Sequence, residues 1–102
     1  MKTILSGKLK NTIYNLTREL GYHFQGADQK TGELGFARPK SGYPRWHLFA
    51  KIEQNSLSIS LHLDQKKPIY DSAAAHNGDY DGPVVVQEFK RIKEYLENQI
   101  NR

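Results

Sequence analysis

The sequence contains no cysteine, and its 102 residues include a single methionine, a single tryptophan and four prolines. Without cysteine the chain can form neither disulfide bonds nor thiolate metal sites, so any metal ion must be held by histidines and carboxylates. Long apolar runs are also lacking. The first residues begin like a signal peptide, but the apolar stretch stops after Ile4 and Leu5 and two lysines soon follow. This pattern predicts a cytoplasmic protein without a membrane span.

The length of the chain limits the number of domains that it can form, and its charge favours certain kinds of partner. A chain of 102 residues is typical of one domain with one hydrophobic core, here residues 1–102. The net charge is +4 and the isoelectric point is near 9.4. Such a basic chain favours phosphate-bearing partners where its positive side chains cluster on one side.

Two segments show the apolar spacing of an α-helix. Apolar residues recur every three or four positions from Leu5 to Leu20, and Gly21 is a natural stop for a helix over residues 5–20. A second helix begins near Pro83. Its expected buried stripe consists of Val85, Phe89, Ile92, Leu96 and Ile100.

Four segments between the helices are typical of β-strands. Residues 22–25 and 33–38 are short, contain aromatics and flank a run of turn formers. Residues 45–53 and 56–64 alternate apolar and polar side chains around a two-residue turn. This predicts a hairpin that pairs residues whose numbers sum to about 109. His47 then lies opposite His62, and Arg45 opposite Asp64, on the face away from the core.

The predicted fold class is therefore α+β. The expected order is helix, four-stranded antiparallel meander, a long loop over residues 65–82, and helix. Both helices are expected to pack on the apolar face of the sheet in two layers, because that face must be covered.

The polar face of this hairpin carries the first candidate site, formed by Arg45, His47, His62 and Asp64, with His76 in the long loop. Opposed imidazoles can share a metal ion, a phosphate or a proton, so His47, His62, Asp64 and His76 are candidate catalytic residues. The three histidines are also candidate zinc ligands, although no short zinc motif is present. The alternative is a solvated face with an ordinary pair between Arg45 and Asp64.

A basic, aromatic loop at one end of the sheet forms the second candidate site. Cations there can neutralise phosphates while Tyr43 stacks on a base, which predicts binding of single-stranded RNA or another phosphate-bearing ligand. The candidate binding residues are Arg38, Lys40, Tyr43, Arg45, His47, His62, Lys66 and Lys67. The alternative is a Gly/Pro turn with solubilising charge.

Oxygen ligands near the second helix have the spacing of a calcium loop. Asn77, Asp79, Asp81 and Glu88 fall at the first, third, fifth and twelfth positions, with Gly82 at the sixth. Asp81 is equally typical of a helix start. Calcium and zinc are thus the two metal ions that the sequence leaves open, and neither is a definite cofactor.

Two stretches resemble a signature of small uncharacterised bacterial proteins: residues 62–68, which read HLDQKKP, and residues 75–83, which read AHNGDYDGP. This resemblance implies no known activity. A second, more limited similarity is to HicA-type RNA-cleaving toxins, in which a helix leads through a glycine into an aromatic strand of a small antiparallel sheet. The Gly-Ser-His strand of those toxins has no counterpart in residues 33–38.

Three functions remain open from the sequence. The first is a nucleic-acid or phosphate-ligand binding module that uses the basic loop and the histidine face. The second is a small hydrolase or nuclease, with or without a metal ion, in which His62 or His47 acts as a base or ligand and Arg45 steadies an anion. The third is a protein-interaction domain without chemistry.

Overall fold

The computed structural model describes residues 1–66 and 78–101. Its elements in chain order are β1 (Lys2–Ser6), β2 (Lys8–Leu9), α1 (Ile13–Glu19), β3 (His23–Ala27), β4 (Leu34–Arg38), β5 (Arg45–Ile52), β6 (Ser56–Asp64), β7 (Gly78–Asp79), α2 (Pro83–Glu97) and β8 (Ile100–Asn101). The main sheet has the order β1-β6-β5-β4-β3, and β7 also pairs with β6. All of its pairings are antiparallel. Strands β2 and β8 form a separate small pair.

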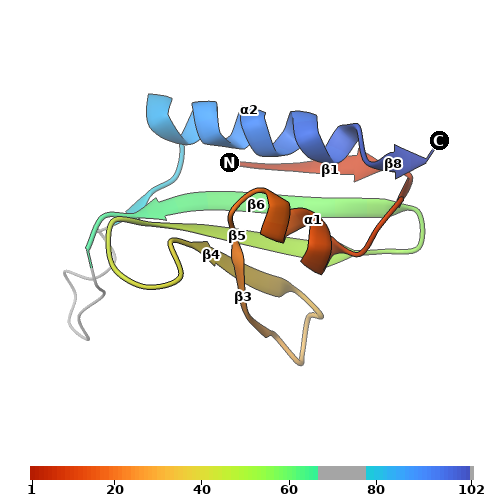
Figure 1. Cartoon of the computed structure of the whole chain (residues 1–102), viewed down its shortest axis with the longest axis horizontal. Coiled ribbons are helices and arrows are strands. Elements are labelled where there is room, and N and C mark those ends of the chain that lie inside the picture. Colours follow the sequence, from red (N-terminus) through yellow and green to blue (C-terminus); the bar gives the residue numbers. More distant parts are fainter. Residues whose placement is uncertain (67–77, 102) are drawn as a thin grey trace.

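The α+β class is confirmed, but the sheet is larger than a four-stranded meander. Strands β3 to β6 do follow one another as expected, and β1 and β7 extend the sheet beyond β6 to six strands. Figure 1 shows β5 and β6 as the long central ribbons, with α2 running along the β1 side. The predicted meander is therefore only the middle and one edge of the sheet.

The predicted helix over residues 5–20 is wrong in its first half. The chain begins with β1, in which Leu5 faces Leu57 of β6, and the helix starts only after Thr12. The hydroxyl of Thr12 accepts a hydrogen bond of 3.2 Å from the backbone N–H of Asn15, which satisfies one of the free donors at the helix start. Gly21, with φ at +95°, follows the helix as expected, because this backbone conformation favours glycine.

The central hairpin has the predicted register. His47 pairs with His62 and Arg45 pairs with Asp64, and the turn closes with a hydrogen bond from the backbone N–H of Glu53 to the carbonyl of Ser56. Alternation along each strand then sends neighbouring side chains to opposite faces of the sheet. One set enters the core, and the other, which includes both histidines, points away from it.

The core lies between one face of the sheet and the two helices. The buried stripe of α2 contains four of the five expected apolar residues, and Ile100 is buried in β8 instead. The core cluster consists of Leu5, Ile13, Leu16, Leu20, Tyr22, Phe36, Leu48, Ala50, Leu57, Ile59, Leu61, Val85, Phe89, Ile92, Leu96 and Ile100. We call this the helix side of the sheet and the opposite side the open face.

In the described part of the chain, no helix is long and apolar enough to cross a membrane. The cytoplasmic location stays a prediction.

Candidate site on the open face of the sheet

The centre of the open face is a carboxylate shared by two imidazoles. Nδ1 of His47 lies 2.8 Å from one oxygen of Asp64, and Nε2 of His62 lies 3.2 Å from the other. The centroids of the two imidazole rings are 5.1 Å apart, and the rings are nearly perpendicular. All three side chains are partly buried, with exposed fractions of 23% for His47 and 14% for each of the other two. We call these three residues the His–Asp–His cluster.

Burial holds the pKa of both imidazoles below its ordinary value of 6.5. The negative charge of Asp64 opposes this effect at both rings, while His62 and Arg45 further lower the pKa of His47. A lowered histidine pKa means that the ring is uncharged near neutral pH.

The shared carboxylate assigns the tautomers of the two rings. Because an ionised carboxylate only accepts hydrogen bonds, each imidazole must place its single proton on the nitrogen that faces Asp64. The remaining nitrogens, Nε2 of His47 and Nδ1 of His62, then carry lone pairs. These atoms can accept a hydrogen bond or bind a metal ion, but they cannot donate to a phosphate oxygen.

Two aromatic rings stack against the imidazole of His62. Phe49 is stacked against it at 5.7 Å between ring centroids, and Tyr80 at 4.9 Å, with interplanar angles of 18° and 21°. His47 meets Phe49 edge-on at 5.9 Å. These contacts limit the rotation of the imidazoles, so the cluster is positioned by packing as well as by hydrogen bonds.

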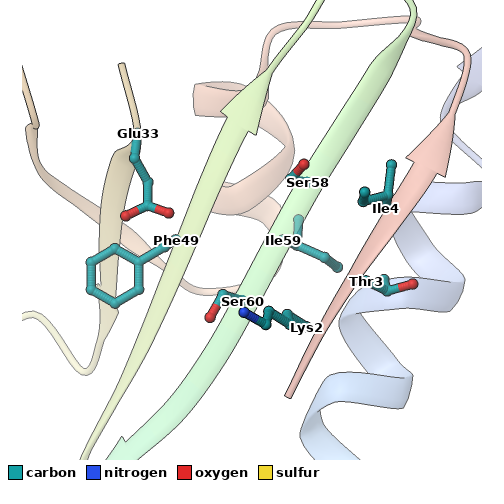
Figure 2. A pocket seen from close by; sticks show the side chains of 8 residues that line it. All are labelled: Lys2, Thr3, Ile4, Glu33, Phe49, Ser58, Ile59 and Ser60. Carbon is teal, nitrogen blue, oxygen red and sulfur yellow. The ribbon is translucent and has the colours of Figure 1, made fainter. Parts of the chain in front are cut away.

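A hollow of about 570 Å³ on the open face is lined in part by Phe49, the residue that also contacts both histidines of the cluster. Figure 2 shows the ring of Phe49 near the carboxylate of Glu33, with Lys2 extending toward Ser60. A second hollow of about 310 Å³ lies on the β3 side of Phe49 and is lined in part by Gly26 and Gly35. Phe49 therefore lies between two hollows on the open face.

Although Arg45 and Asp64 are opposite each other in the register of β5 and β6, their side chains form none of the ion pairs seen among the described residues, contrary to the solvated-face alternative. Its guanidinium lies 4.9 Å from the ring centroid of Tyr43 and donates a hydrogen bond of 3.1 Å to the hydroxyl of that residue. Its Nε is buried and has no hydrogen-bond partner within the described residues. The carboxylate of Asp64 is engaged by the histidines instead.

Arg38 lies on the helix side and is separated from the other predicted binding residues. It contacts Glu88 at 3.1 Å, and Glu88 also accepts hydrogen bonds from the hydroxyl of Tyr22 at 2.6 Å and from Arg91 at 2.8 Å and 2.9 Å. We call these four residues the Glu88 cluster. Lys40 and Lys66 are exposed near the end of the hairpin. Lys67 and His76 lie outside the described residues.

Among the described residues of the calcium-loop spacing, Asp79 and Glu88 have separate partners. One carboxylate oxygen of Asp79 accepts a hydrogen bond of 3.0 Å from the backbone N–H of Gly82, and the carboxylate of Glu88 belongs to the Glu88 cluster. Asn77 lies outside the described residues. Glu88 occurs between Val85 and Phe89 on the buried stripe of α2, a position that could have revealed its burial from the sequence.

Sequence reasoning also missed the contributions of Phe49, Glu33 and Tyr80 to the site. Phe49 could have been found, because its place in the strand alternation already assigns it to the histidine face. Nothing in the sequence pattern brings Tyr80 onto the ring of His62.

Comparison of the chain with protein-family models, curated proteins and solved structures finds no match. The two resemblances noted from the sequence therefore stay predictions, and the function must be argued from the site alone.

Proposed function

We propose that the open face binds single-stranded nucleic acid, with RNA as the favoured ligand. The observation that carries this proposal is the position of Phe49 on the central strand β5, between two hollows. Its neighbours across the strands are small: Gly35 on β4 and Ser60 on β6. An aromatic ring on a sheet face that neither described helix covers, with space beside it, is a platform on which a base can stack.

Positive side chains flank this platform. Lys2 lines the larger hollow, and Arg45 lies toward the other end of the hairpin beyond His47. Both side chains can bind phosphates on either side of a nucleotide that stacks on Phe49. Glu33 also lines the hollow, and its carboxylate can accept a hydrogen bond from the exocyclic amino group of a base.

The tautomers of the cluster change the role proposed for the histidines. His47 and His62 present lone pairs, so they are matched to N–H donors on a base edge and not to phosphate oxygens. Tyr43 is also less suited to stacking than expected, because the guanidinium of Arg45 already covers its ring. The ring of Phe49 also has a partner, because it is stacked against His62, but Phe49 borders both hollows, so we place it ahead of Tyr43 as the residue that stacks on a base.

Fluorescence anisotropy with a short labelled single-stranded RNA, in buffer with a metal chelator, tests this proposal. We expect the affinity to fall steeply as salt rises, because phosphate contacts release counterions. The Phe49→Leu variant should bind about tenfold more weakly, which is the usual cost of losing a base-stacking ring. Phe24→Leu is the matched control, because Phe24 is 48% exposed but packs against Tyr14 and Phe36 outside the proposed platform.

Three outcomes would overturn this function. They are no binding at low salt, binding that is insensitive to salt, and an equal loss of affinity in the Phe49→Leu and Phe24→Leu variants.

A hydrolytic activity is the second candidate, and one observation favours it. Nδ1 of His47 lies 2.8 Å from the carboxylate of Asp64, which favours a proton on this nitrogen and leaves Nε2 as a proton acceptor, the arrangement that a general base needs. Phosphodiester cleavage that is lost in His47→Ala but kept in His23→Ala would support it. RNA binding without any cleavage would contradict the hydrolytic function, and only the binding function would then remain.

A further inference from the structure

The His–Asp–His cluster brings three metal-ligand atoms together on one rigid hairpin. One atom from each of His47, His62 and Asp64 lies within 4.8 Å of the other two. Strands β5 and β6 place the histidines directly opposite each other, and Asp64 follows His62 by two residues on the same face. Ligands on paired strands are held more precisely than ligands on loops.

We propose that this cluster is a binding site for a divalent transition-metal ion of the zinc type. The ion would lie between the nitrogens that face Asp64, namely Nδ1 of His47 and Nε2 of His62, and one carboxylate oxygen. Three protein ligands of this kind leave a further coordination position for water. The proposal concerns the cluster itself and does not depend on the nucleic-acid function.

The ligand set determines which ions the site accepts. Two imidazole nitrogens and one carboxylate oxygen suit zinc, cobalt, nickel, copper or ferrous iron. Calcium and magnesium prefer sites built from oxygen ligands, so neither should compete. The positive charge of Arg45, which acts on His47, opposes any cation and should keep the affinity below that of a site without it.

Binding at these atoms requires each ring to exchange its tautomer. The proton on Nδ1 of His47 must move to Nε2, and the proton on Nε2 of His62 must move to Nδ1, both through solvent. Each ring stays neutral, so the net number of bound protons does not change. This exchange is a specific signature of the proposed geometry, because an ion bound at the outward nitrogens would leave the tautomers as they are.

The surroundings of the cluster support such a site. Phe49 and Tyr80 both stack against His62, so the ring need not be ordered by the ion. The three side chains remain partly exposed, which gives an ion and its water access from the open face.

The test uses the full chain, freed of metal with a chelator and then dialysed. Zinc chloride is titrated by calorimetry, and proton–nitrogen spectra record the tautomer of each histidine before and after. We expect one zinc ion per chain, exchange of the tautomer at His47 and His62, and no change at the exposed His23. Cobalt should give the visible absorption of a four-coordinate ion, and an excess of calcium should displace neither metal.

Variants separate this site from adventitious binding. The His47→Ala and Asp64→Asn variants should each bind zinc at least about tenfold more weakly, since ligand and near-ligand changes typically cost that much or more. His23→Ala is the matched control and should bind as the parent does. Circular dichroism of each variant checks that it is folded.

The proposal is overturned if zinc does not bind, if all three variants bind equally, or if His47 and His62 keep their tautomers at saturation. Because the RNA titrations are carried out with a chelator and these without RNA, either proposal can fail alone.

Discussion

The Glu88 cluster and the His–Asp–His cluster lie on opposite sides of the same sheet, and each is built around one carboxylate. On the helix side, Glu88 is 8% exposed and contacts Tyr22, Arg38 and Arg91, two of which carry positive charge. On the open face, Asp64 is 14% exposed and contacts two imidazoles whose pKa values are lowered. The first carboxylate is neutralised by charged partners, whereas the second lies beside two uncharged rings.

This difference separates a structural role from a chemical one. Glu88 joins α2 to β4 and to the segment before β3, because Tyr22 and Arg38 are far from it in the sequence, whereas Arg91 lies one turn further along α2 itself. Arg91 also donates to the carbonyl of Leu20 at the end of α1. The three residues of the His–Asp–His cluster lie within one hairpin, and among the described residues their contacts with one another join no separate elements. Its ring nitrogens with lone pairs remain able to bind a ligand.

Removal of Glu88 should give the largest effect on stability. In Glu88→Ala the buried hydroxyl of Tyr22 and two guanidinium groups lose their shared acceptor. We expect the free energy of unfolding at neutral pH to fall by about 2–3 kcal/mol, as for hydrogen bonds to a charged group. Urea denaturation measures this loss.

Glu94→Ala, at an exposed position of the same helix, is the control for Glu88→Ala and should change stability by less than about 0.5 kcal/mol. Similar losses of unfolding free energy in the two variants would contradict the structural role of the Glu88 cluster.

The pH dependence of this stability should be smaller and should have a definite sign. Burial raises the pKa of Glu88, but hydrogen bonds from Arg91 and Tyr22 and the charges of Arg38 and Arg91 outweigh it, so the pKa lies below its ordinary value of 4.5. A carboxyl whose pKa is lowered by folding stabilises the protein above its unfolded pKa, and this contribution is lost as pH falls through the folded pKa.

Glu88→Gln provides the measurement, because glutamine resembles the protonated side chain. The difference in unfolding free energy between the parent and Glu88→Gln should be constant near neutral pH and should shrink below about pH 4.5. A difference that stays the same down to pH 3 would mean that the ionised form of Glu88 gains nothing from its partners.

The two clusters also differ in how far they could be predicted from the sequence. The register of β5 and β6 followed from strict alternation and a two-residue turn, so the pairing of His47 with His62 was predictable. The partner of Asp64 was not, because Arg45 and both histidines are all within its reach on one face. Stacking of Arg45 on Tyr43, which leaves the carboxylate to the imidazoles, depends on the conformation of a loop.

Local spacing misled the prediction where it fitted two structures equally well. Leu5 and Leu9 continue the helical period of α1, but Leu5 also has the alternation of a strand, and pairing of β1 with β6 decided between them. Glu88 fits a calcium loop by its number and a buried stripe by its neighbours. In both cases a partner distant in sequence, β6 or Tyr22, selects the structure.

Asp64→Asn should give the smallest change in stability and yet a specific change at the site. An asparagine side chain offers one oxygen as an acceptor and one NH2 group as a donor, so only one imidazole can still donate to it. The other ring must turn its lone pair toward the amide and therefore exchange its tautomer.

In metal-free protein, proton–nitrogen spectra of Asp64→Asn should show exactly one of the rings of His47 and His62 with a changed tautomer. The free energy of unfolding should fall by less than about 1 kcal/mol, because the cluster is partly exposed and joins no distant elements. Asp81→Asn, an exposed aspartate near the same edge, should alter neither ring. If both rings keep their tautomers in Asp64→Asn, the carboxylate does not set them, and the contrast with Glu88 reduces to one of burial alone.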